Sequence, residues 1–571
     1  MSKLTHYLPV LGWGRRYQRN QLSDDLLAAV IVAVMLIPQS LAYAMLAGLP
    51  AEVGLYASIF GLLVYGLLGT STSLSVGPVA VISVMTAAAL ARMAPPDPAS
   101  YAAAALTLAF LSGAFLMLLG ILRLGFMANF LSHPVISAFI TASGIIIAAG
   151  QIRYLLGIGG SGETLLEILV TLYENAADSN LNTGLIGFGS LLVIWWMRNG
   201  LKLFLQKLGI SARNAALMSK GGPLVVVVAT AVLAFLLRLD EKGVALVGAV
   251  PRGLPGLTLP DFSPELVSGL VTSALLIAII GFVESVSVGQ TLAAKKRERI
   301  DPDQELISLG ASNIAVAFTG GLPVTGGFSR SIVNHEAGAA TPAAGIFTAL
   351  LIALATLLLT PLIFWLPRAT LAATIIVAVM SLVDIGALRK AWNFSRADFA
   401  AMLITILLTL LAGIETGIAI GVLTSVLITL YKTSRPHVAV VGRVPGTQHY
   451  RNIKRHNVET FENLLSIRID ESLYFGNSRY LEEMIYRLVA QNPKVKHVIL
   501  IFSAVNQVDM SALETLLKIN ETLSELKIRL HLSEVKGPIM DRLKRTDFFT
   551  RLSGNCYLVH DQAVEDLNQP A

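Results

Sequence analysis

Charged residues and cysteines are both scarce in this 571-residue chain. Asp, Glu, Lys and Arg make up 14% of the residues, against about 25% in soluble globular domains. Hydrophobic residues make up 54%, so the chain cannot supply the polar surface of a soluble protein, whereas a bilayer accepts an apolar exterior. Because Cys556 is the one cysteine, the chain cannot form an internal disulfide framework. We therefore expect an integral membrane protein.

Metal centres and enzyme active sites need groups of residues that this chain lacks. No paired His/Cys spacing typical of metal ligands occurs, and we interpret His133, beside Pro134, as a helix cap. No nucleophile and base accompany the motifs described below. The sequence therefore predicts no metal, no cofactor and no enzymatic activity. The basic residues lie in short clusters between apolar segments, which membrane orientation explains better than nucleic-acid binding, and we expect no nucleic acid as a partner.

Apolar segments long enough to cross a bilayer occupy the chain up to about Tyr431. Two shorter pieces, Gly77–Met93 and Phe328–Gly338, interrupt the series and bring the total to about fourteen membrane elements. An even number places both termini on one side. The longer segments lie near Asp24–Met45, Val53–Leu68, Tyr101–Ile121, Asn129–Gly150, Leu181–Met197, Pro223–Leu237, Leu266–Phe282, Leu306–Phe318, Gly345–Leu362, Ala369–Leu382, Ala400–Leu411 and Gly417–Tyr431.

The basic residues agree with this order of spans. Cytoplasmic loops of membrane proteins are rich in Lys and Arg, and the clusters Arg15–Arg19 and Lys295–Arg299 fall on one side. Loops assigned to the outer side contain few basic residues, among them Arg92 and Arg153. We therefore expect a bacterial inner (plasma) membrane protein with both termini in the cytoplasm. Glu163–Ala177 is expected to form an outer surface helix rather than a span.

The pattern changes after Tyr431. Short apolar runs with β propensity alternate with helical runs, which is typical of a small α/β domain with helices packed on a sheet. Residues 436–455, basic and rich in turn formers, are interpreted as a linker between a membrane domain (1–435) and a soluble domain (456–571). The predicted strands are Leu464–Ile469, Val495–Phe502, Ile528–Leu532 and Cys556–Val559, and the predicted helices are Tyr480–Val489, Ser511–Leu526 and Ile539–Arg545.

Both short membrane elements begin with Gly and Pro. The first starts in Ser75-Val76-Gly77-Pro78-Val79-Ala80. The second starts in Gly320–Arg330, where Gly321 and Pro323 lie two residues apart. A helix that stops inside a membrane leaves backbone N–H groups that a cavity or a substrate must satisfy. The two elements are third and tenth in the count, which are equivalent positions in two seven-element repeats. Such a pair indicates the central site of a transporter.

Two helix N-termini that face each other would form an anion site without a metal, because their dipole ends are positive. Arg330, at the start of the second element, adds a full charge. The alternative interpretation is that Gly and Pro only kink two spans and that Arg330 pairs with a structural carboxylate. The matched pair and Arg330 together favour a substrate site.

Three further residues of the apolar spans are candidates for this site. Glu284 lies in a span without another ionisable group until Lys295, where an unpaired carboxylate is costly. It is either a proton carrier or an ion-pair partner of Arg330, and both interpretations place it at the site. Gln39 and Tyr43 lie one turn apart on one face of the first span, a spacing that by itself is typical of packing residues.

The motifs resemble those of a known family. Ile37-Pro38-Gln39-Ser40-Leu41-Ala42-Tyr43-Ala44, Gly48-Leu49-Pro50, Gly54-Leu55-Tyr56 and Ser75–Ala80 occur in the order found in the SulP anion permeases, solute carrier family 26. The resemblance continues through Glu284 and Thr325-Gly326-Gly327-Phe328-Ser329-Arg330-Ser331. It extends into the C-terminal domain, which is similar to a STAS (sulfate transporter and anti-sigma antagonist) domain, and so covers essentially the whole chain.

The resemblance implies a seven-plus-seven inverted repeat of the uracil-transporter-like type, an all-α membrane fold followed by the small α/β STAS domain. It also implies a homodimer and an elevator motion of a core domain against a gate domain. In such relatives the anion lies between the third and tenth elements. The expected substrate-binding residues are Gln39, Tyr43, Pro78, Val79, Ala80, Gly327, Phe328, Ser329 and Arg330, with Glu284 in proton coupling.

The resemblance leaves several substrates open, because relatives carry sulfate, bicarbonate, chloride, oxalate or dicarboxylates on similar scaffolds. Phe328-Ser329-Arg330-Ser331 is similar to the form in sulfate permeases, whereas the sodium-coupled cyanobacterial bicarbonate branch lacks this arginine and has Asp at the position of Glu284. Sulfate uptake by proton symport is therefore the first expectation. A C4-dicarboxylate such as succinate, or bicarbonate, is the alternative, and a passive anion channel or a membrane scaffold acting through STAS are alternative classes.

The soluble domain differs from anti-sigma antagonists at one position. In those proteins the residue after the motif aspartate is the phosphorylated serine, whereas here Asp509 is followed by Met510 and then Ser511. A phosphorylation switch at that residue is therefore excluded. We interpret Asp509 and Ser511 as the loop and N-cap before a helix. Regulation through these residues, or docking of a cytoplasmic protein partner, is the alternative.

Overall fold

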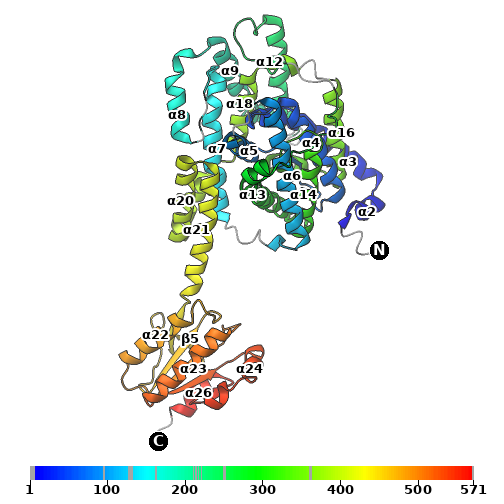
Figure 1. Cartoon of the computed structure of the whole chain (residues 1–571). Helices are drawn as coiled ribbons and strands as arrows, with labels where there is room; N and C mark the ends of the chain where they lie inside the picture. Colours follow the sequence, from blue (N-terminus) through cyan, green and yellow to red (C-terminus); the bar gives the residue numbers. More distant parts are fainter. Residues whose placement is uncertain are drawn as a thin grey trace. The chain divides into compact units, whose positions relative to one another are not determined.

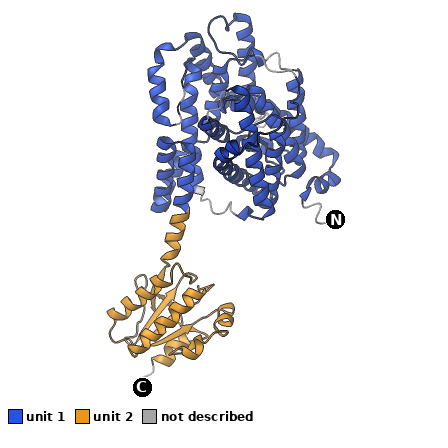
Figure 2. Ribbon diagram, viewed as in Figure 1, with its two compact units in different colours: residues 1–425 blue, residues 426–571 orange. Residues whose placement is uncertain are grey.

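The computed structural model divides into two compact units, Met1–Ser425 and Val426–Ala571 (Figure 2). The first unit consists almost entirely of helices, and the second contains a sheet (Figure 1). The structure describes residues 7–93, 97–126, 133–160, 162, 164–209, 211, 215, 218–219, 221–248, 253–358 and 363–568.

Each of the fourteen predicted membrane segments overlaps a helix in the described part of the first unit. Among the described residues, seven stretches are long and apolar enough to cross a membrane, by length and composition. The fourteen helices are α3 (Arg19–Leu46), α4 (Ala51–Leu68), α5 (Ala80–Met93), α6 (Pro98–Ile121), α7 (His133–Leu156), α9 (Leu181–Asn199), α12 (Gly222–Leu237), α13 (Pro264–Lys296), α14 (Pro302–Ala317), α15 (Phe328–Ala337), α16 (Ala343–Leu358), α18 (Arg368–Met380), α20 (Arg396–Ala412) and α21 (Ile414–Ser434).

Several boundaries differ from the predicted ones. Helix α13 extends to Lys296, well past the expected end at Phe282, because Glu284 and the serines that follow it interrupt the apolar run but not the helix. The segment expected as an outer surface helix contains α8 (Leu165–Glu174), which begins with a capping box between Thr164 and Glu167. Smaller helices in the described part of the unit are α2 (Val10–Trp13), η1 (Gly14–Arg16), η3 (Ala176–Asp178), α10 (Leu201–Lys207) and α19 (Ile385–Phe394).

The fourteen helices pack as two groups. In the first group α6 packs on α13 and α14, α4 on α14 and α16, α3 on α4, α15 and α16, and α5 on α13. In the second group α7 packs on α9, α18 and α20, and α12 packs on α9. Helix α21 joins the second group, since Gly421 lies against Thr405 of α20 and Val135 of α7. The first group thus holds elements one to four and eight to eleven, as two equivalent halves require.

Glycines allow α6 and α14 to approach closely. A Cβ atom at Gly113 of α6 would lie 2.7 Å from the carbonyl oxygen of Gly310 in α14. A Cβ atom at Gly310 would lie 2.7 Å from the backbone nitrogen of Met117 and 2.8 Å from the carbonyl oxygen of Gly113. Small residues at such a crossing let backbones touch where lipid offers no hydrophobic driving force. This contact holds together the two sequence halves of the first group.

We expect Gly310→Ala to destabilise the protein, because the added methyl group meets backbone atoms that cannot move aside. The melting temperature in detergent should fall by several degrees. The matched control is Gly189→Ala in α9, where a Cβ atom would meet nothing within 4 Å. Removing glycine from a helix interior gains about 1 kcal/mol, so this variant should melt at or above the wild-type temperature. Equal melting temperatures for the two variants would contradict the packing argument.

The second unit is built on a six-stranded sheet with the order β4-β3-β5-β6-β7-β8. Strands β5 to β8 are parallel, and β3 pairs antiparallel with both β4 and β5. Its core contains Ile467, Leu500 and Leu516, all fully buried. The elements are β3 (Val438–Arg443), β4 (Tyr450–Asn452), β5 (Leu464–Ile469), α22 (Ser478–Gln491), β6 (His497–Ile501), α23 (Met510–Glu525), β7 (Arg529–Ser533), α24 (Gly537–Leu543), α25 (Phe548–Arg551), β8 (Cys556–Tyr557) and α26 (His560–Leu567).

The interpretation of residues 436–455 as a linker is corrected by this sheet. The segment contains β3 and β4, joined by a hairpin whose turn includes Gly446 with a φ of +71°. The Pro445-Gly446 pair makes this turn, but its composition resembles that of a linker. Within β3, Ala439 and Val441 are buried while Val438 and Val440 are partly buried, which is the alternation of a strand.

Candidate functional site

The two broken membrane elements start from one antiparallel ribbon. Strands β1 (Val76–Gly77) and β2 (Thr325–Gly326) pair Val76 with Gly326 and Gly77 with Thr325. The backbone N–H of Gly327 also donates to the carbonyl of Ser75, at 3.1 Å. Helix α5 follows the first strand and α15 follows the second. The third and tenth elements therefore begin side by side, as their matched positions in the sequence predicted.

The side chain of Arg330 cross-links this ribbon. It is 2% exposed and donates from Nε to the carbonyl of Ser75 (2.8 Å) and from Nη1 to that of Pro78 (2.6 Å). Its Nη2 donates to the carbonyls of Gly77 (2.7 Å) and Thr325 (2.8 Å). Arg330 therefore binds the backbone at both helix interruptions. These carbonyls occupy most of the hydrogen-bond donors of Arg330, which was expected to bind the substrate.

The lack of a side chain at Gly327 makes room for the guanidinium. A Cβ atom there would lie 2.7 Å from Cζ and Nε of Arg330, closer than real Cβ contacts allow. The alternative that Arg330 pairs with a structural carboxylate finds no support among the described ion pairs, none of which includes Arg330. Its charge still interacts electrostatically with Glu284 and with Tyr43. The positive charge therefore acts across the site rather than through one ion pair.

Helix α13 holds the second strand of the ribbon in place. The Thr325 hydroxyl donates to the carbonyl of Gly281 at 2.6 Å, and it lies 2.8 Å from the hydroxyl of Ser285. The Ser285 hydroxyl oxygen in turn accepts from the backbone N–H of Gly326 at 2.9 Å. Sequence reasoning missed this role of Ser285, whose adjacency to Glu284 in an apolar span was the one available signal.

The tips of the two broken helices differ in exposure. Phe328 is 45% exposed and Ser329 is partly exposed, so the N-terminal turn of α15 borders open space. Gly327 provides no side-chain cap, and the first N–H groups of a helix have no partner within it. At the tip of α5, Val79 is 7% and Ala80 2% exposed. The first turn of α15 is therefore less buried than that of α5.

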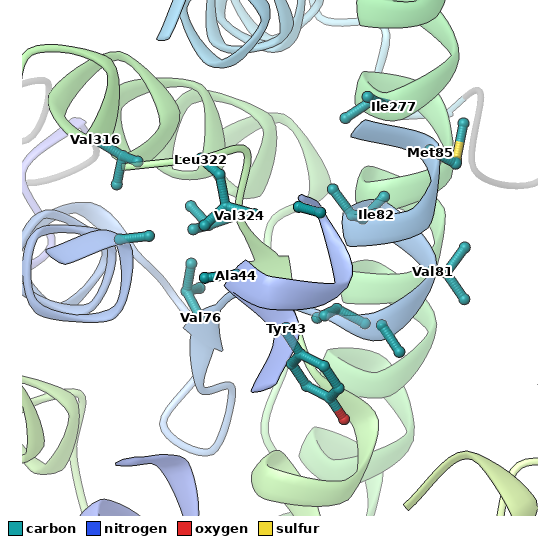
Figure 3. Packing of buried hydrophobic residues seen from close by; sticks show 14 of the residues in the cluster. Tyr43, Ala44, Val76, Val81, Ile82, Met85, Ile277, Val316, Leu322 and Val324 are labelled. Carbon is teal, nitrogen blue, oxygen red and sulfur yellow. The ribbon is translucent and has the colours of Figure 1, made fainter. Parts of the chain in front are cut away.

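The first span contributes Tyr43 beside this region. Tyr43 is 7% exposed and interacts electrostatically with both Arg330 and Glu284. Figure 3 shows its ring at the edge of a cluster of buried apolar side chains, with the hydroxyl group pointing away from them. Gln39, one turn earlier on α3, is 8% exposed. Tyr43 of α3, Glu284 of α13 and Arg330 of α15 thus lie within electrostatic range of one another.

In the soluble unit, Asp509 is the N-cap of α23. One carboxylate oxygen accepts from the N–H of Ala512 and the other from the N–H of Phe475, each at 2.8 Å. The aspartate therefore ties the β5–α22 loop to the start of α23, while Ser511 lies in the first turn.

Burial lowers the pKa of His531 to about 4, so at neutral pH this imidazole is uncharged in the domain core.

We expect Arg330→Lys to lower the melting temperature. A lysine ammonium donates from one atom and cannot reach four carbonyls spread over both strands, and each buried carbonyl left unpaired costs about 1–3 kcal/mol. The control is Arg368→Lys, since Arg368 is exposed and donates to a single carbonyl, that of Leu246. An Arg330→Lys protein with wild-type melting temperature would show that the cross-link is dispensable.

Two family models match the chain. The model of the sulfate permease family matches residues 22–405, and the model of the STAS domain matches residues 455–563. The resemblance expected from the motifs is confirmed. The probable sulfate transporter 4.2 of Arabidopsis thaliana is 33% identical over 580 residues, which cover 98% of this chain and 84% of that protein. The high affinity sulfate transporter 2 of Stylosanthes hamata is 31% identical over 553 residues, 94% of this chain and 82% of that one.

Solved structures share the fold. Murine Solute Carrier 26 family member A9, an anion transporter solved in the inward-facing state, superposes with a TM-score of 0.88 at 24% identity, covering 99% of this chain and 94% of that one. The transmembrane domain of the cyanobacterium bicarbonate transporter BicA superposes with a TM-score of 0.60 at 22% identity, covering 72% of this chain and 98% of that one. The expected membrane fold with a C-terminal STAS domain is confirmed.

Proposed function

Because the chain belongs to the sulfate permease family, we propose that it carries a small anion across a membrane and binds that anion at the tips of α5 and α15. The chain is a multi-pass membrane protein of a family of transporters. The observation that carries the proposal is the ribbon from which both broken helices start, with a buried guanidinium between them.

The electrostatics of this arrangement favour an anion. Each helix tip presents roughly half a positive charge from its aligned peptide dipoles, and Arg330 adds a full one. Because the carbonyls of the ribbon occupy most of the arginine's donors, the anion itself is bound by the free N–H groups at the start of α15 and by nearby side chains. The proposed binding residues are Gln39, Tyr43, Pro78, Val79, Ala80, Gly327, Phe328, Ser329 and Arg330.

Sulfate with proton symport is the proposed substrate and coupling. Support comes from the names of the relatives, which are sulfate transporters, and from Glu284, a carboxylate that the Arg330 charge reaches without an ion pair. A proton on Glu284 would offset one negative charge of the incoming anion. Bicarbonate is the second candidate, because the neighbour BicA is a bicarbonate transporter, and a C4-dicarboxylate is the third.

The two helix groups support an elevator motion. The ribbon and Arg330 join the starts of α5 and α15, and the Thr325 and Ser285 hydrogen bonds attach α13 to the same ribbon. The site would therefore move with the first group relative to the second. The proposal includes alternating access by such a motion. It also includes a homodimer and an inner (plasma) membrane location with cytoplasmic termini. We also propose that a cytoplasmic protein docks on the soluble domain at the end of α23 that carries Asp509 and Ser511.

Two other classes make different predictions. A passive anion channel on the same fold would conduct down a gradient without a coupled proton. A membrane scaffold that acts through the STAS domain would transport nothing. Measured flux and its dependence on a proton gradient separate the three.

The purified full-length protein should drive sulfate uptake into proteoliposomes. We expect radiolabelled sulfate to accumulate above equilibrium with an inward proton gradient, and an uncoupler should abolish that accumulation. Bicarbonate and succinate are measured in parallel. Sulfate flux that is insensitive to the gradient would eliminate symport, and the absence of any anion flux in folded protein would favour the scaffold.

Glu284→Gln should remove proton coupling while anion exchange persists, because glutamine keeps the size and polarity of the side chain but cannot ionise. Gradient-driven uptake is expected to fall at least about tenfold, whereas sulfate counterflow stays within about threefold. The control is Glu265→Gln, an exposed position in the first turn of the same helix.

Arg330→Ala should weaken sulfate binding, and unchanged affinity would exclude Arg330 from the site.

A further inference from the structure

An ion pair joins the two helix groups far from the proposed site. Nη1 of Arg92 lies 2.6 Å from Oε2 of Glu415. Arg92 is in the last turn of α5 and Glu415 in the first turn of α21. Twelve residues separate Ala80, at the site, from Arg92, which is about 18 Å along the helix at 1.5 Å per residue. The pair therefore closes the end of α5 opposite to the anion site.

The Glu415 carboxylate binds two helices of the first group at once. Its Oε2 accepts from Arg92 of α5, and its Oε1 accepts from the hydroxyl of Ser273 in α13, at 3.2 Å. The Glu415 side chain is 8% exposed and that of Arg92 54%. Both α5 and α13 carry proposed site residues. One nearly buried acidic group of the second helix group is thus the common partner of two site-bearing helices.

The apolar packing around this contact is incomplete. A cavity of about 230 Å³ lies beside the ion pair. Its wall contains Val84 and Ala88 of α5 on one side, Ile147 of α7 and Ile168 of α8 on the other, together with Arg92 and Glu415 themselves. The two groups leave a hollow here, and the polar contacts of Glu415 join them at its edge.

We propose that Arg92, Ser273 and Glu415 form a latch that keeps the outer ends of the two helix groups closed and that opens whenever the anion site is exposed to the outer side. The inference rests on the proposed alternating access. The end that carries Arg92 is the one with few basic loop residues, which charge distribution assigns to the outside. A contact made in only one of two conformations shifts their equilibrium toward that conformation.

Another arginine at the same cavity provides the contrast. Arg153 also lines it, but its guanidinium donates to the carbonyl of Gly160 and to the hydroxyl of Tyr154. Both partners belong to the same end of α7 and the loop after it, so Arg153 does not connect the two groups. Loss of Arg153 removes a charge from the cavity and leaves the latch intact.

The test measures opening directly in the full-length chain. Cys556 is replaced by serine, and Ala88→Cys places a thiol on the cavity wall for labelling with a membrane-impermeant maleimide from the outer side. Arg92→Gln and Glu415→Gln should each speed labelling about tenfold, the change expected for loss of a half-buried ion pair. Arg92→Lys should stay near the background rate, and Arg153→Gln within about twofold of it.

Further outcomes separate the latch from the proposed function. The double variant Arg92→Gln/Glu415→Gln should label no faster than the quicker single variant, because both changes remove one interaction. Unchanged labelling in folded Arg92→Gln protein, whose substitution is at a half-exposed residue, would overturn the latch, as would an equal effect of Arg153→Gln. Faster labelling without any anion uptake would instead refute the proposed transport and leave the latch standing.

Discussion

The membrane unit depends on one interaction, the binding of the Arg330 guanidinium by backbone carbonyls from two distant segments. Breaking two helices inside a membrane leaves carbonyls and N–H groups that lipid cannot satisfy. Four hydrogen bonds from one side chain satisfy the carbonyls of Ser75, Gly77, Pro78 and Thr325. Conversely, a buried guanidinium is costly unless its donors are used. The two unfavourable features, an interrupted backbone and a buried charge, stabilise each other.

This mutual dependence means that the proposed anion site would not need a protein cation that is free to pair with the anion. The hydrogen bonds hold the arginine in place, and none of the ion pairs in the described part of the chain includes it. Helix tips then supply donors whose positions the ribbon determines. An anion bound at the proposed site would not compete with Glu284 for a guanidinium. In the proposed function, the anion and the proton on Glu284 would therefore influence each other through the electric field rather than by exchanging partners.

Much of this arrangement could be predicted from the sequence. Long apolar runs identify spans because nothing else explains twenty such residues in a row, and the Gly-Pro starts identify the two interruptions. The pairing of Val76 with Gly326 could not be predicted, since it depends on how helices far apart in the chain pack. The strands in residues 436–455 were missed because Pro445-Gly446 has the composition of a linker. The carbonyl partners of Arg330 carry no sequence signal, because every residue has a carbonyl.

Helix α13 is one continuous rod of 33 residues, about 50 Å long at 1.5 Å per residue. Near its start, Ser273 contacts Glu415, and its centre holds the ribbon through Ser285. At its far end, Lys296 donates to the carbonyl of Ala339 at 2.6 Å. No proline follows Pro264 in this helix, and proline is a main cause of sharp helix kinks. In the proposed elevator motion, a displacement of this helix at Ser273 would therefore be carried to Lys296, so one rod would link the contacts at the two ends of the membrane unit.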